Sequence, residues 1–205
     1  MSNNVPIGMQ VKELRPTQMT VGYREIAAKR RRWADADEKE RSHLLRRHII
    51  PAVIGPKHRV YVVDHHHFAR ALLQEDVERV AVYVLADLSG LCKSEFWTFL
   101  DNSAWCHAYD ADGKRRPLDN IPKTLADLAD DPFRSLAGAL IRRGGCAKSE
   151  KPFAEFLWAD FLRRRLDRKQ VEDDFDAAVE EALVLARKEG ARCLPGWCGN
   201  GGEGL

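Results

Sequence analysis

One junction constrains this chain more than any other feature: an apolar strand runs directly into polar residues at the start of a helix. Val60–Val63 consists of β-branched and aromatic residues without interruption, which is typical of a buried strand. Asp64–His67 follows at once, and the Ala- and Leu-rich segment Phe68–Leu73 predicts a helix. The sequence therefore predicts an abrupt strand-to-helix turn at Asp64.

The start of this predicted helix favours an anion. The first turn of a helix carries free backbone N–H groups and the positive end of the helix dipole, and both attract phosphate. Three consecutive histidines, His65, His66 and His67, add donors whose charge changes near neutral pH. We therefore assign His66 and His67 to catalysis and phosphate binding, and His65 to cofactor binding. Asp64 is assigned to catalysis and to a divalent metal, because its carboxylate can orient an imidazole or hold the ion.

Two alternatives remain open for this run. In the first, Asp64 merely caps the helix and the three histidines are surface residues. In the second, the three histidines share one metal ion. The second alternative is disfavoured because successive residues of a helix point about 100° apart.

The elements around the junction alternate between strands and helices. Strands are expected over 9–14, 51–54, 60–63 and 80–85, and helices over 21–33, 37–48 and 68–73. Local hairpins mixed with helices predict the α+β class. From residue 90 onward the pattern is mostly helical, with Asp131 as a cap and Pro132 at the first position of one helix. Two domains, 1–89 and 90–205, are expected, with the second packed on the first.

Val60–Ala71 resembles the signature of the ParB/sulfiredoxin superfamily, in which an apolar strand leads through a short Gly- and His- or Arg-containing turn into an Ala-rich helix. Pro16–Gln18 is similar to the first conserved box of the same fold. The resemblance implies a small mixed sheet with flanking helices. In the second half, Asp131–Ala137 and Pro152–Asp160 resemble the subgroup named as ParB-like nucleases.

The resemblance adds further candidate residues. The residues expected to bind a nucleotide are Gln18, Gly22, Lys29, His65 and Arg70. Glu25 lies in the region where free-serine kinases of this superfamily carry a catalytic glutamate, and it is expected to act as a base. The alternative for Glu25 is a surface carboxylate that faces Lys29 one helical turn away.

This chain departs from the family pattern at three positions. His65 stands where glycine is usual, which narrows the approach of a phosphate. Phe68 stands where arginine is usual, and Arg70 is the nearest candidate to replace it. His66 stands where sulfiredoxin carries its nucleophilic cysteine, so sulfiredoxin activity is not expected.

Composition excludes several classes of function. The net charge of +2 is too small for a chain that coats nucleic acid by bulk charge, although basic runs such as Lys29–Arg32 leave a DNA contact open. No apolar run reaches the length of a membrane span, and Met1–Gln10 lacks the features of a secretory signal, so we expect the cytoplasm. The 5 cysteines are odd in number and scattered, which does not indicate a disulfide framework.

Three functions fit these observations. The first is an enzyme that binds a nucleoside di- or triphosphate with Mg²⁺ and transfers or hydrolyses its terminal phosphate. The second is a nuclease or DNA-binding protein of the ParB-like type. The third is a non-catalytic interaction module, in which the altered signature has lost its activity and the aromatic second half binds a partner.

Overall fold

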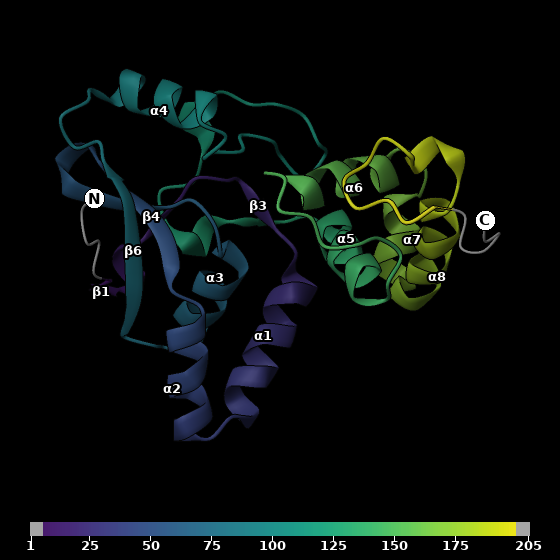
Figure 1. Ribbon diagram of the computed structural model, residues 1–205, viewed down its shortest axis with the longest axis horizontal. Coiled ribbons are helices and arrows are strands. Elements are labelled where there is room, and N and C mark those ends of the chain that lie inside the picture. The colour runs from purple at the N-terminus through teal and green to yellow at the C-terminus, as the bar shows by residue number, and fades with distance from the viewer. Residues whose placement is uncertain (1–5, 200–205) are drawn as a thin grey trace. The chain divides into compact units, whose positions relative to one another are not determined.

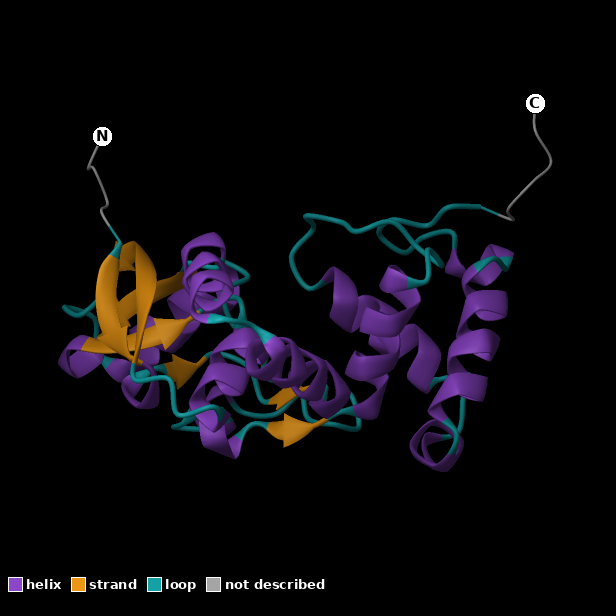
Figure 2. Cartoon of the chain, turned by 90° about the horizontal axis from the view of Figure 1, so that it is seen from below, coloured by secondary structure: helices purple, strands orange, loops and turns teal. Residues whose placement is uncertain are grey.

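The computed structural model describes residues 6–199 and divides the chain into two compact units. The first comprises the residues up to 21, 25–110 and 114–129, and the second comprises 22–24, 111–113 and the residues from 130 onward. Both strands and helices are present, which confirms the α+β class (Figure 2). The expected boundary at residue 89 stays a prediction; residues 90–110 and 114–129 group with the first unit.

A five-stranded mixed sheet forms the centre of the first unit, in the order β1-β6-β4-β5-β2 (Figure 1). The strands are β1 (Ile7–Gln10), β2 (Arg15–Pro16), β4 (Ile50–Gly55), β5 (Arg59–Val62) and β6 (Arg79–Asp87). β4 pairs antiparallel with β5 and parallel with β6, and β2 runs parallel to β5. A separate two-stranded sheet pairs β3 (Thr20–Val21) with β7 (Ala129–Asp130).

The helices of the first unit are α1 (Tyr23–Asp35), α2 (Glu38–Arg47), α3 (His66–Gln74) and α4 (Lys93–Asn102). The predicted strand β5 is buried as expected, and its successive residues face opposite layers. Val62 packs in one core with Leu72 of α3. Tyr61 packs in another with Phe96 of α4. The sheet therefore lies between α3 on one face and α4 on the other.

Two predicted elements near the N-terminus differ in length from the expectation. The strand predicted over 9–14 ends at Gln10, because the N–H of Val11 donates to the Glu78 carbonyl at 3.0 Å and the chain turns into a short 3-10 helix. The helix predicted over 37–48 is α2. Asp37 is its N-cap, and its carboxylate accepts from the N–H of Glu40 while the Glu40 side chain accepts from the N–H of Asp37.

The second unit is helical, as predicted. Its helices are α5 (Pro132–Arg142), α6 (Ala154–Arg163), α7 (Arg168–Asp173) and α8 (Phe175–Ala186). Leu136, Leu140, Trp158 and Leu162 lie in its core with little or no exposed surface. Asp131 caps α5 by accepting from the N–H of Phe133 at 3.0 Å, and Pro132 is the first helical residue, which confirms both predictions.

Across residues 6–199, every helix is too short or too polar to cross a membrane.

Candidate phosphate-binding site

The turn between β5 and α3 places His65 directly before the helix in a left-handed conformation, with φ 65° and ψ 24°. Its N–H donates to the Asp64 carboxylate at 2.6 Å, so this carboxylate is bound to the turn that precedes α3. Glycine adopts a left-handed conformation without strain, and histidine is among the residues that tolerate it. His65 therefore preserves the backbone shape that the usual glycine of the signature provides.

His66 is buried, with 4% of its surface exposed. Its Nε2 atom accepts a hydrogen bond from the N–H of Thr17 at 3.1 Å. The Thr17 hydroxyl donates in turn to the Val62 carbonyl at 2.8 Å, at the end of β5. The segment that resembles the first box of the superfamily is thus fixed against the start of α3. An accepting Nε2 requires the ring proton on Nδ1, which sets the tautomer of His66.

Basic residues from α1, from the end of α2 and from the turn itself lie near His48. The His48 ring, at the C-terminal end of α2, lies 5.9 Å from the His65 ring and 5.1 Å from the Phe68 ring. Burial lowers the pKa of His48, and the nearby positive charges of His65, Lys29, Arg32 and Arg47 lower it further. We call these five residues the cationic cluster: Lys29, Arg32, Arg47, His48 and His65. The cluster supplies positive charge beside Phe68, the position at which the family pattern has arginine.

The face of α1 that contributes to the cluster also carries Glu25. Residues four apart on a helix lie on one face, so Glu25 and Lys29 share it, and Arg32 lies one further turn along. Glu25 is half-buried in the first turn of α1. Its predicted role as a base stays a prediction.

Two other predicted ligand-binding residues are engaged with backbone. The Gln18 amide, which is buried, donates from Nε2 to the Thr20 carbonyl at 2.7 Å. Arg70, on α3, donates from Nη1 to the Leu125 carbonyl at 2.8 Å. Arg70 thereby holds a loop of the first unit, and its expected contact with a nucleotide stays a prediction.

Gly22 belongs to the second unit and approaches α5 closely. A Cβ atom at this position would lie 2.5 Å from the Ser135 hydroxyl oxygen and 2.7 Å from its backbone nitrogen. The first two backbone N–H groups of α1 are hydrogen-bonded nearby. The N–H of Tyr23 donates to the Asp130 carboxylate at 2.7 Å, and the N–H of Arg24 donates to the Ser135 hydroxyl at 3.2 Å. The absence of a side chain at Gly22 is therefore explained by packing, and its expected approach to a ligand stays a prediction.

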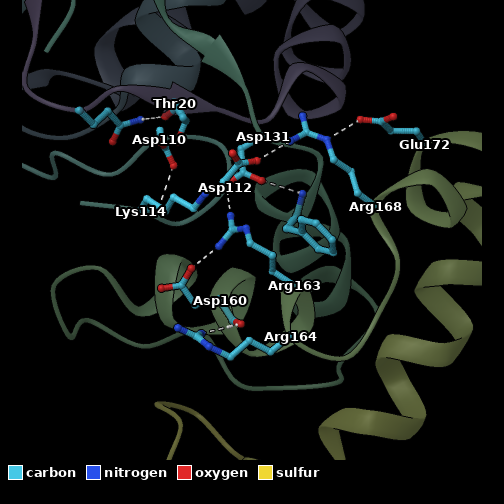
Figure 3. A network of polar contacts seen from close by, with 12 residues as sticks. Thr20, Asp110, Asp112, Lys114, Asp131, Asp160, Arg163, Arg164, Arg168 and Glu172 are labelled. Atoms are coloured by element: carbon cyan, nitrogen blue, oxygen red, sulfur yellow. Dashed lines mark hydrogen bonds and ion pairs between the residues drawn. The ribbon is translucent and has the colours of Figure 1, made fainter. Parts of the chain in front are cut away.

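The Asp131–Ala137 motif forms an ion-pair network inside the second unit (Figure 3). Arg163 of α6 pairs with both Asp131 and Asp160, and Arg168 of α7 pairs with Asp112 at 3.4 Å. Burial raises the pKa of Asp131, although Arg163 acts in the opposite direction. Because Asp131 also caps α5, this network joins α5 to α6 and serves the fold of the unit.

The metal site predicted at Asp64 stays a prediction. Among the residues the structure describes, no three His, Cys, Asp or Glu side chains come close enough to hold one ion. Asp64 is an exposed carboxylate next to the turn. Mg²⁺ is commonly held by one or two carboxylates together with the phosphates of a substrate, so a single aspartate fits an ion that arrives with a nucleotide.

The sequence analysis missed three members of the cationic cluster as site residues: Arg32, Arg47 and His48. Arg32 and Arg47 belong to basic runs that are visible in the sequence, and His48 ends a predicted helix. Cations at the end of a helix are also explained by the helix dipole, so nothing in the sequence separated them from ordinary surface residues.

The fold and the Asp-His turn define a ParB-like protein. The family described as "Putative ParB-like nuclease" matches residues 7–164, and the chain belongs to this family. Among solved structures, the crystal structure of protein Atu1540 from Agrobacterium tumefaciens is similar, with a TM-score of 0.88 and 48% sequence identity. The match covers 95% of this chain and 98% of that chain. No curated protein matches.

Proposed function

We infer that this protein binds the phosphate groups of a nucleoside di- or triphosphate at the start of α3 and transfers or hydrolyses a terminal phosphoryl group. The observation that carries this proposal is the position of the His48 ring, 5.9 Å from the His65 ring at the start of α3. Lys29, Arg32 and Arg47 lie near enough to His48 to lower its pKa. A phosphate there would meet both the positive charges of Lys29, Arg32 and Arg47 and the positive end of the α3 dipole.

The positive charge of the cluster would stabilise the transition state of phosphoryl transfer as well as the bound nucleotide. Catalysis of phosphoryl transfer rests mainly on positioning and on stabilising the negative charge of the transferred group. Lys29 and Arg32 would provide that charge from α1. Glu25, on the same face, would take the proton from the attacking hydroxyl or water. Asp64 would hold a Mg²⁺ ion that arrives with the nucleotide, and that ion would supply further positive charge.

Nuclease activity is the second candidate, and the description of the family favours it. The exposed basic run Lys29–Arg32 on α1 also suits a DNA backbone. Both candidates break a phosphorus–oxygen bond, which is a phosphoanhydride in the nucleotide and a phosphodiester in DNA. They differ in the size of the substrate and in salt dependence. Binding of DNA through several phosphate contacts weakens steeply as salt increases.

Calorimetric titration with ATP and magnesium, and with a short DNA duplex at several salt concentrations, tests the proposal. We expect ATP to bind, and the double variant Lys29→Gln/Arg32→Gln to bind at least tenfold more weakly, since each lost charge-assisted hydrogen bond costs about 1.5–3 kcal/mol. Lys39→Gln is the matched control, because Lys39 lies at the opposite end of α2 from Arg47. Salt-sensitive DNA binding without ATP binding would replace the nucleotide proposal with the nuclease. If the protein binds neither ATP nor DNA, the non-catalytic interaction module is the function that still fits.

A further inference from the structure

A stacked pair of rings, His107 and Tyr109, lies beside the backbone segment that His66 binds. The two ring centroids are 4.5 Å apart and the ring planes differ by 29°. The N–H of His107 donates to the Thr17 carbonyl at 2.8 Å, and Gln18 and His107 form a parallel β-bridge. Thr17 therefore connects the ring pair on one side with His66, at the start of α3, on the other.

The backbone holds both rings in place. Alternate residues of an extended segment project to the same side, so His107 and Tyr109 face one way and Ala108, which is 2% exposed, faces the core. Tyr109 pairs with Arg115 in an antiparallel bridge, and the Ala108 carbonyl accepts from the N–H of Arg116 at 2.8 Å. Both residues are partly exposed. The result is a fixed aromatic surface within the first unit.

We propose that His107 and Tyr109 form the stacking surface for the base of the nucleotide whose phosphates bind at the start of α3. This assignment rests on the proposed function. Base–aromatic stacking depends on the π-face that every base carries, so the surface would accept a nucleobase without reading its identity through hydrogen bonds. Thr17 contacts both His66, at the start of α3, and His107, so the phosphate site and the rings are neighbours, which argues for a nucleotide as the occupant.

The test compares ATP with inorganic tripolyphosphate, which carries the phosphates without a base. We expect Tyr109→Leu to weaken ATP binding by roughly 5- to 150-fold and to leave tripolyphosphate binding unchanged. Tyr109→Phe keeps the ring and should bind ATP as the wild type does. In the wild-type protein, ATP should shift the NMR signals of the His107 ring through the ring current of the base, and tripolyphosphate should not.

The outcomes separate the two proposals. Unchanged ATP affinity in Tyr109→Leu, with tripolyphosphate still bound, overturns the stacking surface and keeps the phosphate site. Equal weakening of both ligands also overturns the stacking surface. Failure of the wild-type protein to bind either ligand overturns both proposals. If Tyr109→Leu fails to fold, the NMR shifts of the wild-type protein decide the question.

Discussion

The N–H of Thr17 donates to Nε2 of the buried His66 ring at 3.1 Å, so one side chain fixes the first box to helix α3. His66 is thus placed to hold the shape of the turn, and His67, the next residue, is half-buried. The two histidines, assigned the same role from the sequence, should respond differently to substitution.

We expect His66→Ala to lower the free energy of unfolding by about 1–3 kcal/mol, because the buried Thr17 N–H loses its acceptor. His67→Ala should leave stability nearly unchanged and weaken ATP binding about tenfold to a hundredfold. Chemical denaturation and calorimetry measure the two effects. Equal losses of stability in both variants would contradict the division of roles.

The pKa of His48 should report an anion in the cationic cluster. It lies below its ordinary value of 6.5 through burial and neighbouring cations. A bound phosphate supplies negative charge and should raise it, which NMR titration of the ring measures with and without tripolyphosphate. His65→Gly gives a comparison, because removing the neighbouring His65 ring should also raise the pKa of His48. If the pKa of His48 stays the same at saturating tripolyphosphate, no anion binds at this position.

The same pKa predicts a dependence of stability on pH. Because the folded pKa of His48 is lower than that of the unfolded chain, the unfolded state binds the proton more readily. Stability should therefore fall as pH decreases below about 6.5 and recover as pH rises. His48→Gln should flatten this part of the curve, which thermal unfolding across pH 5–7 measures.

Glu25→Gln should separate binding from turnover. A base acts in the transition state, so we expect ATP affinity to be retained and any phosphoryl transfer to fall about 10²- to 10⁴-fold. Glu38→Gln, at an exposed position in the first turn of α2, is the control. Full turnover in Glu25→Gln would remove Glu25 from the mechanism without affecting the phosphate site.

Gly22→Ala should destabilise the protein through a collision with Ser135. The added Cβ would lie 2.5 Å from the Ser135 hydroxyl oxygen, and overpacking of this kind costs about 1–3 kcal/mol. Gly90→Ala is the matched control, since a Cβ there meets no atom within 4 Å. Wild-type stability in Gly22→Ala, measured by thermal unfolding, would show that the backbone around Ser135 yields more easily than this contact implies.

Local features were predictable from the sequence, and distant contacts were not. The β5–α3 turn and the Asp131 cap depend on residues adjacent in the chain, so pattern and capping chemistry sufficed. The contact of His48 with His65 and the hydrogen bond of His107 to Thr17 both join segments far apart in sequence. Gly22 meets Ser135, more than a hundred residues away, so the sequence showed a glycine without showing its neighbour.

The left-handed conformation of His65 has an evolutionary consequence. Because the turn fixes the backbone at φ 65°, selection at this position acts on side chains that tolerate that angle, chiefly Gly, Asn, Asp and His. These four residues differ in the charge and size of their side chains, so the charge beside His48 can change while the backbone of the turn stays the same. A single codon can therefore retune the charge of the site, and β-branched residues such as Val or Ile should be absent from functional variants at position 65.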